Sequence, residues 1–190
     1  MPTRALLDLI VIRHGETEAN ARGIWQGPTD SPLTARGRAQ ARAVGAMLAR
    51  MGIGPGTHRL LSSPQPRALA TARLAFAAEP ETDERLREIG IGAWAGRPVA
   101  ELRAGLPTEA DLVALYDAAP GGEGTRALAA RVDGLLADLA GPAILVTHGM
   151  TGRMIRARAR GLAVAALPGL PPGQGRAVRV TRAGETVLRP

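Results

Sequence analysis

The stretch Leu9-Ile-Val-Ile-Arg-His-Gly-Glu-Thr17 decides the fold, because an apolar run ends abruptly in charged and small residues. Residues 9–12 form a short run of branched apolar side chains, which is typical of a strand buried on both faces of a parallel sheet. Arg13 and His14 stand where this strand gives way to a loop, and Gly15 is expected to leave room for a ligand near the backbone. Ligands bind at the carboxyl ends of strands in open α/β sheets, so this position predicts a binding site.

A second apolar run ends in the same way near the end of the chain. Residues 143–147 precede His148 and Gly149, and a helical pattern begins directly after them. His14 alone would be interpreted as a hydrogen-bonded residue at a strand end. Two strand–His–Gly units favour a functional interpretation, because parallel neighbours would bring both imidazoles to one edge of the sheet. The third histidine, His58, lies in a loop rich in Gly and Pro and is expected at the surface.

The rest of the chain alternates short apolar runs with amphipathic stretches. This pattern predicts a three-layer α/β/α sandwich with a mostly parallel mixed sheet. A terminal hairpin would add an antiparallel edge, and we expect one domain over residues 1–190. Further strands are expected at 59–62, 177–181 and 186–188, with an extended segment at 84–88. Helices are expected at 34–52, 64–77, 126–139 and 150–160, with weaker ones inside 99–117 and loops at 13–32 and 168–175.

The composition of the chain narrows its chemistry. The 190 residues include no Cys and give a formal net charge of +7, and all 24 Lys plus Arg residues are Arg. Without Cys, a thiolate metal site, an iron–sulfur cluster and a cysteine nucleophile are excluded. The bias toward Arg, Ala, Gly and Pro follows from GC-rich codons, so it does not by itself predict an acidic partner. We expect no metal, no cofactor, no membrane segment and a cytoplasmic location.

A basic stretch after the second His–Gly unit raises the alternative of nucleic-acid binding. Arg153, Arg156 and Arg160 are spaced by three and four residues and share one face of the predicted helix. We favour a solvated helix face, since cations near a helix C-terminus complement its dipole. We therefore expect no nucleic acid, and nothing in the sequence predicts an oligomeric state.

Two more polar residues stand beside predicted turns. Arg67 falls in the first turn of a predicted helix, where a cation opposes the helix dipole, so its position predicts an anion nearby. The alternative is a solvent-facing Arg in an Arg-rich chain. Glu88 precedes a glycine-rich turn and could donate a proton to a leaving alcohol. Its alternative is a surface Glu paired with a neighbouring Arg.

These segments resemble the signatures of the histidine phosphatases, also called the phosphoglycerate mutase-like superfamily. The resemblance covers nearly the whole chain, and its motifs occur in the family's order. A single Arg-His-Gly triplet would prove little, whereas the ordered set is specific. The matching residues are 13–17 with Asn20; Gly27, Asp30, Pro32, Leu33, Thr34 and Gly37; 62–64 with Arg67, Ala68, Thr71 and Ala72; Leu86, Glu88, Gly92, Trp94 and Gly96; and 147–149.

The resemblance implies a role for each polar residue. His14 would be the nucleophile that forms a phosphohistidine. Glu88 would protonate the leaving oxygen and then activate water to hydrolyse the phosphoenzyme. The groups implied to hold the phosphoryl oxygens are Arg13, Arg67 and His148, with Asn20 assisting. Phosphoryl transfer needs positioning and charge stabilisation, and such a set supplies both without a metal.

The activity that this resemblance implies is a metal-independent phosphomonoester hydrolase acting on a small phosphorylated metabolite. One alternative is cofactor-dependent phosphoglycerate mutase-type transfer, although the chain lacks the long insertion of those mutases. Another is a non-catalytic module that binds phosphorylated ligands. Ala95, Gly124 and Met150 depart from the family's usual residues, which affects the substrate and not the catalytic groups. The candidate pocket residues are Thr17, Trp25, Gln26, Gly149 and Met150, with further walls expected from 23–30, 96–117 and 168–175.

Overall fold

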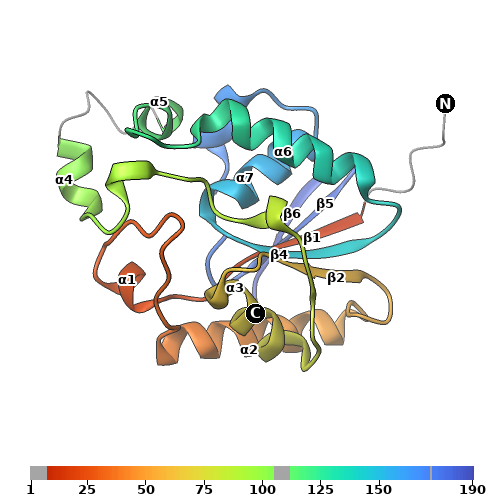
Figure 1. Cartoon of the computed structure of the whole chain (residues 1–190). Helices are drawn as coiled ribbons and strands as arrows, with labels where there is room; N and C mark the ends of the chain where they lie inside the picture. The colour runs from red at the N-terminus through yellow and green to blue at the C-terminus, as the bar shows by residue number, and fades with distance from the viewer. Residues whose placement is uncertain (1–7, 105–111, 172) are drawn as a thin grey trace.

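The computed structural model describes residues 8–104, 112–171 and 173–190, and one mixed sheet forms its centre (Figure 1). The strands are β1 (Asp8–Arg13), β2 (Arg59–Ser62), β3 (Glu81–Thr82), β4 (Ala143–Thr147), β5 (Ala177–Thr181) and β6 (Gly184–Leu188). Their order in the sheet is β3-β2-β4-β1-β5-β6. The first four strands are parallel, whereas β5 is antiparallel to β1 and β6 is antiparallel to β5. The predicted parallel sheet with an antiparallel C-terminal edge is confirmed.

Helices cover both faces of this sheet, which confirms the predicted three-layer sandwich (Figure 1). α2 (Ala35–Arg50) and α3 (Pro66–Phe76) pack together on one face. α6 (Gly124–Asp138) and α7 (Gly149–Ala159) pack together on the other. In the described part of the chain, no helix is both long enough and apolar enough to cross a membrane.

The alternation of side chains along β1 explains why its apolar run is continuous. Successive side chains of a strand point to opposite faces of the sheet. Leu9 and Val11 enter the core beneath α6 and α7, whereas Ile10 and Ile12 enter the core beneath α2 and α3. All four are at most 4% exposed. A strand covered on both faces needs an apolar residue at every position, as this sequence provides.

The helices on the α2 side begin where the sequence predicts. Thr34 is the N-cap of α2, and its hydroxyl accepts a hydrogen bond from the Gly37 N–H at 3.0 Å. This cap satisfies one of the unpaired donors of the first turn. Pro66 occupies the first turn of α3, where its missing N–H costs nothing. Sequence signals at helix starts therefore placed both helices correctly.

The pairing of β1 with β4 places two histidines at the same edge of the sheet. Arg13 stands opposite Thr147 in the parallel register. The next residue, His14, donates its backbone N–H to the Thr147 carbonyl at 2.8 Å. The rings of His14 and His148 consequently lie with centroids 5.1 Å apart. The expectation that both imidazoles meet at one edge is confirmed.

The segment at 84–88 is not extended, contrary to our prediction. It contains a 3-10 helix, Glu84–Leu86, which begins after Asp83. The Asp83 carboxylate accepts the Arg85 N–H at 2.8 Å, so a local cap stabilises the turn over an extended chain. Leu86 is fully buried, which fixes the turn against the core.

Two predicted loops also contain short helices. Within 13–32 lies α1 (Glu18–Ala21), which forms because Thr17 and Asn20 make a reciprocal capping box. The loop expected at 168–175 begins inside a 3-10 helix, Val164–Gly169. A further 3-10 turn forms at Gly92–Trp94, within the predicted glycine-rich turn. The weaker helices expected inside 99–117 are confirmed as α4 (Val99–Ala104) and α5 (Leu112–Asp117). Residues 105–111 of that range lie outside the described residues.

His58 is buried, so its expected surface position is wrong. Its ring is beside two polar side chains, with Nδ1 2.9 Å from the Thr57 hydroxyl and Nε2 3.6 Å from an Asp8 carboxylate oxygen. The His58 N–H donates to the Gly54 carbonyl, and this turn brings the ring beside β1. His58 therefore belongs to the packing at the N-terminal end of β1, away from the edge that holds the other two histidines.

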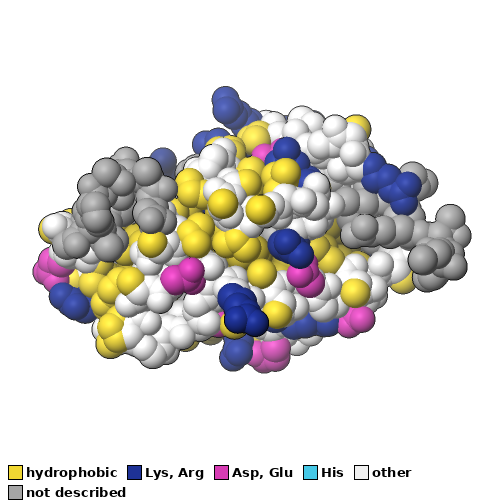
Figure 2. All heavy atoms as spheres, turned by 90° about the horizontal axis from the view of Figure 1, so that it is seen from above, with side chains coloured by type: hydrophobic (Ala, Val, Ile, Leu, Met, Phe, Trp, Pro, Cys, Tyr) yellow, Lys and Arg dark blue, Asp and Glu magenta, His cyan; other side chains and the backbone are white. Residues whose placement is uncertain are grey.

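The basic residues of α7 do not form the solvated face that we predicted. Arg156 is 2% exposed and donates to Glu185 of β6 at 2.7 and 3.0 Å. Arg160 reaches the same carboxylate at 3.3 Å, and Arg153 lines a cavity. On this side of α7 the arginines meet Glu185 of β6 and the carbonyls of Leu170 and Pro171, which a helix periodicity alone does not reveal. On the face shown in Figure 2, basic and acidic side chains alternate over the surface with no continuous basic area.

Candidate active site

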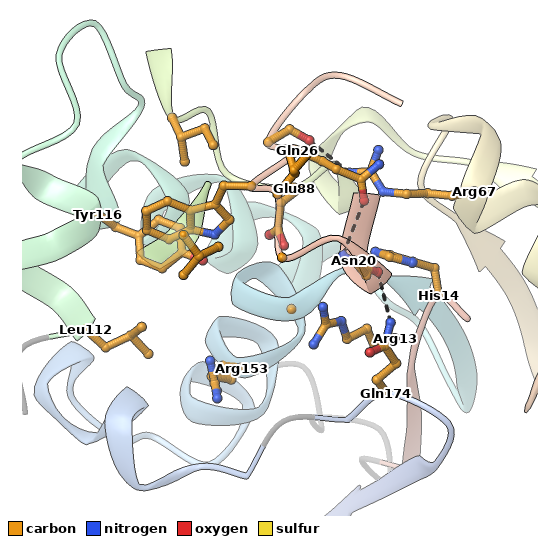
Figure 3. A pocket seen from close by; sticks show the side chains of 17 residues that line it. Arg13, His14, Asn20, Gln26, Arg67, Glu88, Leu112, Tyr116, Arg153 and Gln174 are labelled. Atoms are coloured by element: carbon orange, nitrogen blue, oxygen red, sulfur yellow. Dashed lines mark hydrogen bonds between the residues drawn. The ribbon is translucent and has the colours of Figure 1, made fainter. Parts of the chain in front are cut away.

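A cavity of about 370 Å³ opens at the carboxyl ends of β1 and β4 (Figure 3). Its wall combines the loop after β1, the start of α7 and the inner side of α5. The polar side chains that line it are Arg13, His14, Asn20, Gln26, Arg67, Glu88, Arg153 and Gln174. The apolar ones are Ile24, Trp25, Ile91, Val99, Leu112 and Tyr116. The cavity thus has a charged end near His14 and an apolar end near α5.

His14 is fixed with one ring nitrogen free. Its Nδ1 lies 2.8 Å from the Gly15 carbonyl, and because a carbonyl only accepts, Nδ1 must carry the proton. Burial, followed by the positive charges of Arg13 and Arg67, holds the pKa of His14 well below its ordinary value. The ring is therefore neutral at neutral pH, with a lone pair at Nε2. A lone pair on a neutral, oriented imidazole is a nucleophile.

His148 is held by a hydrogen bond to its other ring nitrogen, Nε2. Its Nε2 lies 2.8 Å from the Ser63 hydroxyl, which also accepts the Gln65 N–H at 3.3 Å. Among the described residues the Ser63 proton has no other acceptor, so we assign it to Nε2 of His148. Burial, the His14 ring and the two neighbouring arginines hold the pKa of His148 well below its ordinary value. A neutral His148 that accepts at Nε2 carries its single proton on Nδ1.

Two arginines supply the positive charge of the site. Arg13 is partly buried beside His14, and desolvation lowers the pKa of Arg13. Arg67 is 2% exposed, and its guanidinium donates to the Asp30 carboxylate at 3.0 Å and to two backbone carbonyls at 2.6 and 2.8 Å. The anion predicted near Arg67 is therefore supplied in part by Asp30. The same contacts hold the guanidinium in a single orientation.

Three buried donors near the His14 ring have no hydrogen-bond partner in the described part of the chain, although His148 itself does not line the cavity. They are Nε of Arg13, Nε of Arg67 and Nδ1 of His148. Buried polar groups are nearly always paired, and each unpaired one costs about 1–3 kcal/mol. Three unpaired N–H groups close to His14 form a receptor for an anion with several acceptor oxygens.

Glu88 is held at the N-terminus of α7. Its carboxylate accepts the N–H groups of Met150 at 3.2 Å and Thr151 at 3.1 Å, and also the Thr151 hydroxyl at 3.2 Å. Its own N–H donates to the Gln65 side chain at 2.8 Å. The carboxylate therefore lies at the cavity, 3.5 Å from the position that a Cβ on Gly149 would take. The alternative of a surface Glu paired with a neighbouring Arg does not hold.

A hydrogen-bonded chain of polar side chains closes the side of the cavity. Thr17 donates its hydroxyl proton to the Gln26 side chain at 2.7 Å, and the Asn20 amide donates to the same oxygen at 3.4 Å. Gln174 in turn donates to the Asn20 carbonyl oxygen at 3.0 Å. Asn20 is thus oriented from two sides, with its side chain on the cavity wall (Figure 3).

Three sequence predictions about the pocket need correction. Thr17 and Met150 do not line the cavity, since both are fully buried and act through a cap and a backbone N–H. Gly15 does not make room for a ligand. A Cβ there would lie 2.3 Å from the Gly37 carbonyl of α2, so the missing side chain permits backbone packing. Trp25, Gln26 and Gly149 do line the cavity, as predicted.

Three contributors were not recognised from the sequence. Ser63 carried a usable signal, because it follows the end of β2 at the same sheet edge as the histidines. Arg153 also carried one, since it lies one helical turn after Gly149. Gln174 had no local signal, because only the return of the chain before β5 brings it to Asn20.

The family model of the histidine phosphatase superfamily (branch 1) matches residues 9–188. The chain belongs to this superfamily. It is an enzyme of the histidine phosphatase type, and the sequence resemblance is confirmed over nearly its whole length.

Several known proteins are similar to this histidine phosphatase. A protein named probable phosphoglycerate mutase GpmB, from Salmonella paratyphi B, is 33% identical over 186 residues, which cover 92% of this chain and 81% of the relative. A putative alpha-ribazole-5'-P phosphatase from Escherichia coli K-12 has a TM-score of 0.77 at 27% identity, with 97% of each chain covered. A mycobacterial glucosyl-3-phosphoglycerate phosphatase solved with VO3 has a TM-score of 0.77 at 29% identity, with 92% of this chain and 90% of that chain covered.

Proposed function

We propose that this histidine phosphatase hydrolyses phosphomonoesters through a phosphohistidine formed on Nε2 of His14. One observation carries the proposal: three unpaired buried N–H donors lie near an imidazole whose free nitrogen bears a lone pair. Donors on Arg13, Arg67 and His148 match the several oxygens of a phosphoryl group. A nucleophile in the same place gives that group an atom to attack it.

In the first step, Nε2 of His14 attacks phosphorus while the ester P–O bond breaks on the opposite side. The P–N bond forms with the lone pair of the ring, and the leaving oxygen takes a proton from Glu88. The guanidinium groups and the Nδ1–H of His148 stabilise the charge on the equatorial oxygens. Two of these donors are preorganised, since Ser63 orients His148 and Asp30 orients Arg67.

In the second step, water attacks the phosphohistidine and Glu88 takes a proton from it. The P–N bond breaks, its electron pair returns to Nε2, and inorganic phosphate leaves. General acid–base catalysis of this kind contributes about 10²–10⁴-fold. The backbone donors of α7 hold the Glu88 carboxyl in place for both proton transfers.

Two alternatives are weaker. Phosphoryl transfer between positions of phosphoglycerate is supported by the name of the Salmonella relative, whereas the names of two similar structures describe phosphatases. A binding module without turnover would not need a nucleophile, yet His14 retains its lone pair and Glu88 its place at the cavity.

The test is hydrolysis of p-nitrophenyl phosphate, with EDTA present to remove free metal ions. We expect turnover by the unmodified protein, loss of at least about 10⁴-fold in His14→Asn, and normal turnover in His58→Asn, which changes the remote histidine. An active His14→Asn would overturn the proposed nucleophile. Transfer between 2- and 3-phosphoglycerate faster than hydrolysis would favour the mutase alternative.

A further inference from the structure

The end of the cavity away from His14 has an aromatic wall. Trp25 lies with its ring centroid 4.9 Å from that of Tyr116 at an interplanar angle of 61°, and 6.1 Å from that of Trp94 at 13°. Trp25 and Tyr116 line the cavity, together with Leu112 and Val99. Burial raises the pKa of the Tyr116 phenol, which keeps it uncharged. This surface is suited to a flat apolar group.

Arg153 stands beside this wall, at the same end of the cavity (Figure 3). Its Nε donates to the Leu170 carbonyl at 2.9 Å, which aims the rest of the guanidinium. In the described part of the chain no carboxylate lies within ion-pair distance of it. By contrast, Arg156 on the same helix and Arg160 directly after the helix share Glu185. Arg153 is therefore an exception among the α7 cations.

The setting of Arg153 is unfavourable for a cation without an anion. Burial lowers the pKa of Arg153, and the positive charges of Arg13 and Arg156 act in the same direction. Arg153 is partly buried and lines the cavity, and an Arg fork matches a carboxylate or phosphate in two parallel hydrogen bonds. A phosphoryl group at His14 would meet Arg13 and Arg67, which leaves Arg153 for a second anionic group.

We propose that the substrate is a phosphomonoester whose alcohol part carries a flat apolar body and a second anionic group, the body against Trp25 and Tyr116 and the anion at Arg153. This inference rests on the proposed function, since it takes the His14 end as the phosphoryl site. A three-carbon phosphorylated acid has both charges but no body to cover the aromatic wall. Arg153 is accordingly a specificity-determining residue, positioned by the Leu170 carbonyl.

The test uses binding, so that it does not depend on turnover. Benzylphosphonate and 4-carboxybenzylphosphonate differ by one carboxylate and are not hydrolysed at a P–O ester bond. By calorimetry we expect the carboxylated ligand to bind the unmodified protein about tenfold more tightly or better, as for a charged hydrogen bond. In Arg153→Gln this ratio falls to near one. The matched control is Arg158→Gln on the same helix, whose ion pair with Asp133 lies at the surface, and it keeps the ratio.

Three results would overturn the inference. Equal affinity of both ligands for the unmodified protein would rule out recognition of a second anionic group. An equal loss of affinity for both ligands in Arg153→Gln would show that Arg153 has only a structural role. If a puckered-ring analogue, (4-carboxycyclohexyl)methylphosphonate, binds as tightly as 4-carboxybenzylphosphonate, the preference for a flat body is ruled out. Failure of the proposed function is distinct, because it would appear as absence of p-nitrophenyl phosphate hydrolysis in a protein that still binds these phosphonates.

Discussion

The two strand–His–Gly junctions share a sequence pattern but present their histidines in opposite ways. After β1, the His14 ring donates from Nδ1 to a backbone carbonyl and keeps Nε2 bare. After β4, the His148 ring accepts at Nε2 from Ser63 and carries its proton on Nδ1, without a partner. The first arrangement supplies a lone pair for bond formation, and the second supplies a hydrogen-bond donor for oxygen. One motif therefore serves two chemical tasks, and the residue bonded to each ring decides which.

The glycines of the two junctions differ as well. A Cβ on Gly15 would lie 2.3 Å from the Gly37 carbonyl of α2, a contact that backbone cannot relieve. A Cβ on Gly149 would meet Arg13 and Glu88 at 3.5 Å, which is ordinary contact. The first glycine serves the packing of the sheet on α2, whereas the second lies at the cavity. The two junctions thus differ in whether a side chain could replace the glycine, as well as in the chemistry of their histidines.

The largest expected effect concerns these glycines. We expect Gly15→Ala to lower the free energy of unfolding by about 3 kcal/mol or more, because the backbone around α2 must shift. Gly149→Ala should change it by less than about 1 kcal/mol. Urea titration of both variants measures the difference. Equal stability of the two would contradict the packing role of Gly15.

The next effect is the dependence of stability on pH. Both rings have a pKa below the ordinary 6.5 in the folded protein, so the unfolded chain binds more protons between that lowered pKa and about 6.5. The free energy of unfolding is therefore greatest above pH 6.5 from this source. It falls as the pH drops below that value, by up to about 1.4 kcal/mol per pH unit for each ring.

Single variants divide this dependence between the junctions. We expect His14→Asn and His148→Asn each to reduce the slope of unfolding free energy against pH between about pH 6.5 and the onset of acid unfolding. Denaturant titrations at several pH values provide the measurement. A slope that neither variant changes would show that the two rings are not held neutral.

The smallest expected effect concerns Ser63, which orients His148. In Ser63→Ala the ring loses its donor at Nε2, and we expect a mixture of ring tautomers with a loss of about tenfold in kcat, which corresponds to about 1.4 kcal/mol. Nitrogen NMR of the His148 ring reports the tautomer directly. Ser63→Thr should restore both, and Ser62→Ala is the matched control. An unchanged tautomer in Ser63→Ala would remove this role.

The fold could be predicted from the sequence because its central strands β1 and β4 are covered on both faces. The continuous apolar run of β1, the N-cap at Thr34 and the first-turn Pro66 are local signals with a direct physical cause. The short 3-10 helices escaped prediction, since a single cap such as Asp83 decides them. A weak local preference of this kind is not visible as a periodicity.

The charged end of the site was predictable and its surroundings were not. His14, His148, Arg67 and Glu88 each follow or precede a predicted turn, and the sheet register brings them together. The role of Arg153 depends on whether a distant strand offers it a carboxylate, as β6 does for Arg156. Such long-range pairing is a property of the fold, and the helix periodicity alone led to the wrong solvated face.

The most direct test of the account is to trap the phosphorylated enzyme and locate its phosphorus. Phosphorylated substrate is mixed with the protein and quenched in alkali, which preserves phosphohistidine, and the modified peptide is identified by mass spectrometry and phosphorus NMR. We predict phosphorus on Nε2 of His14, more of it in Glu88→Gln and none in His14→Asn. Phosphorus on His148 or on any other residue, or hydrolysis without a covalent intermediate, would contradict the different roles assigned to the two histidines.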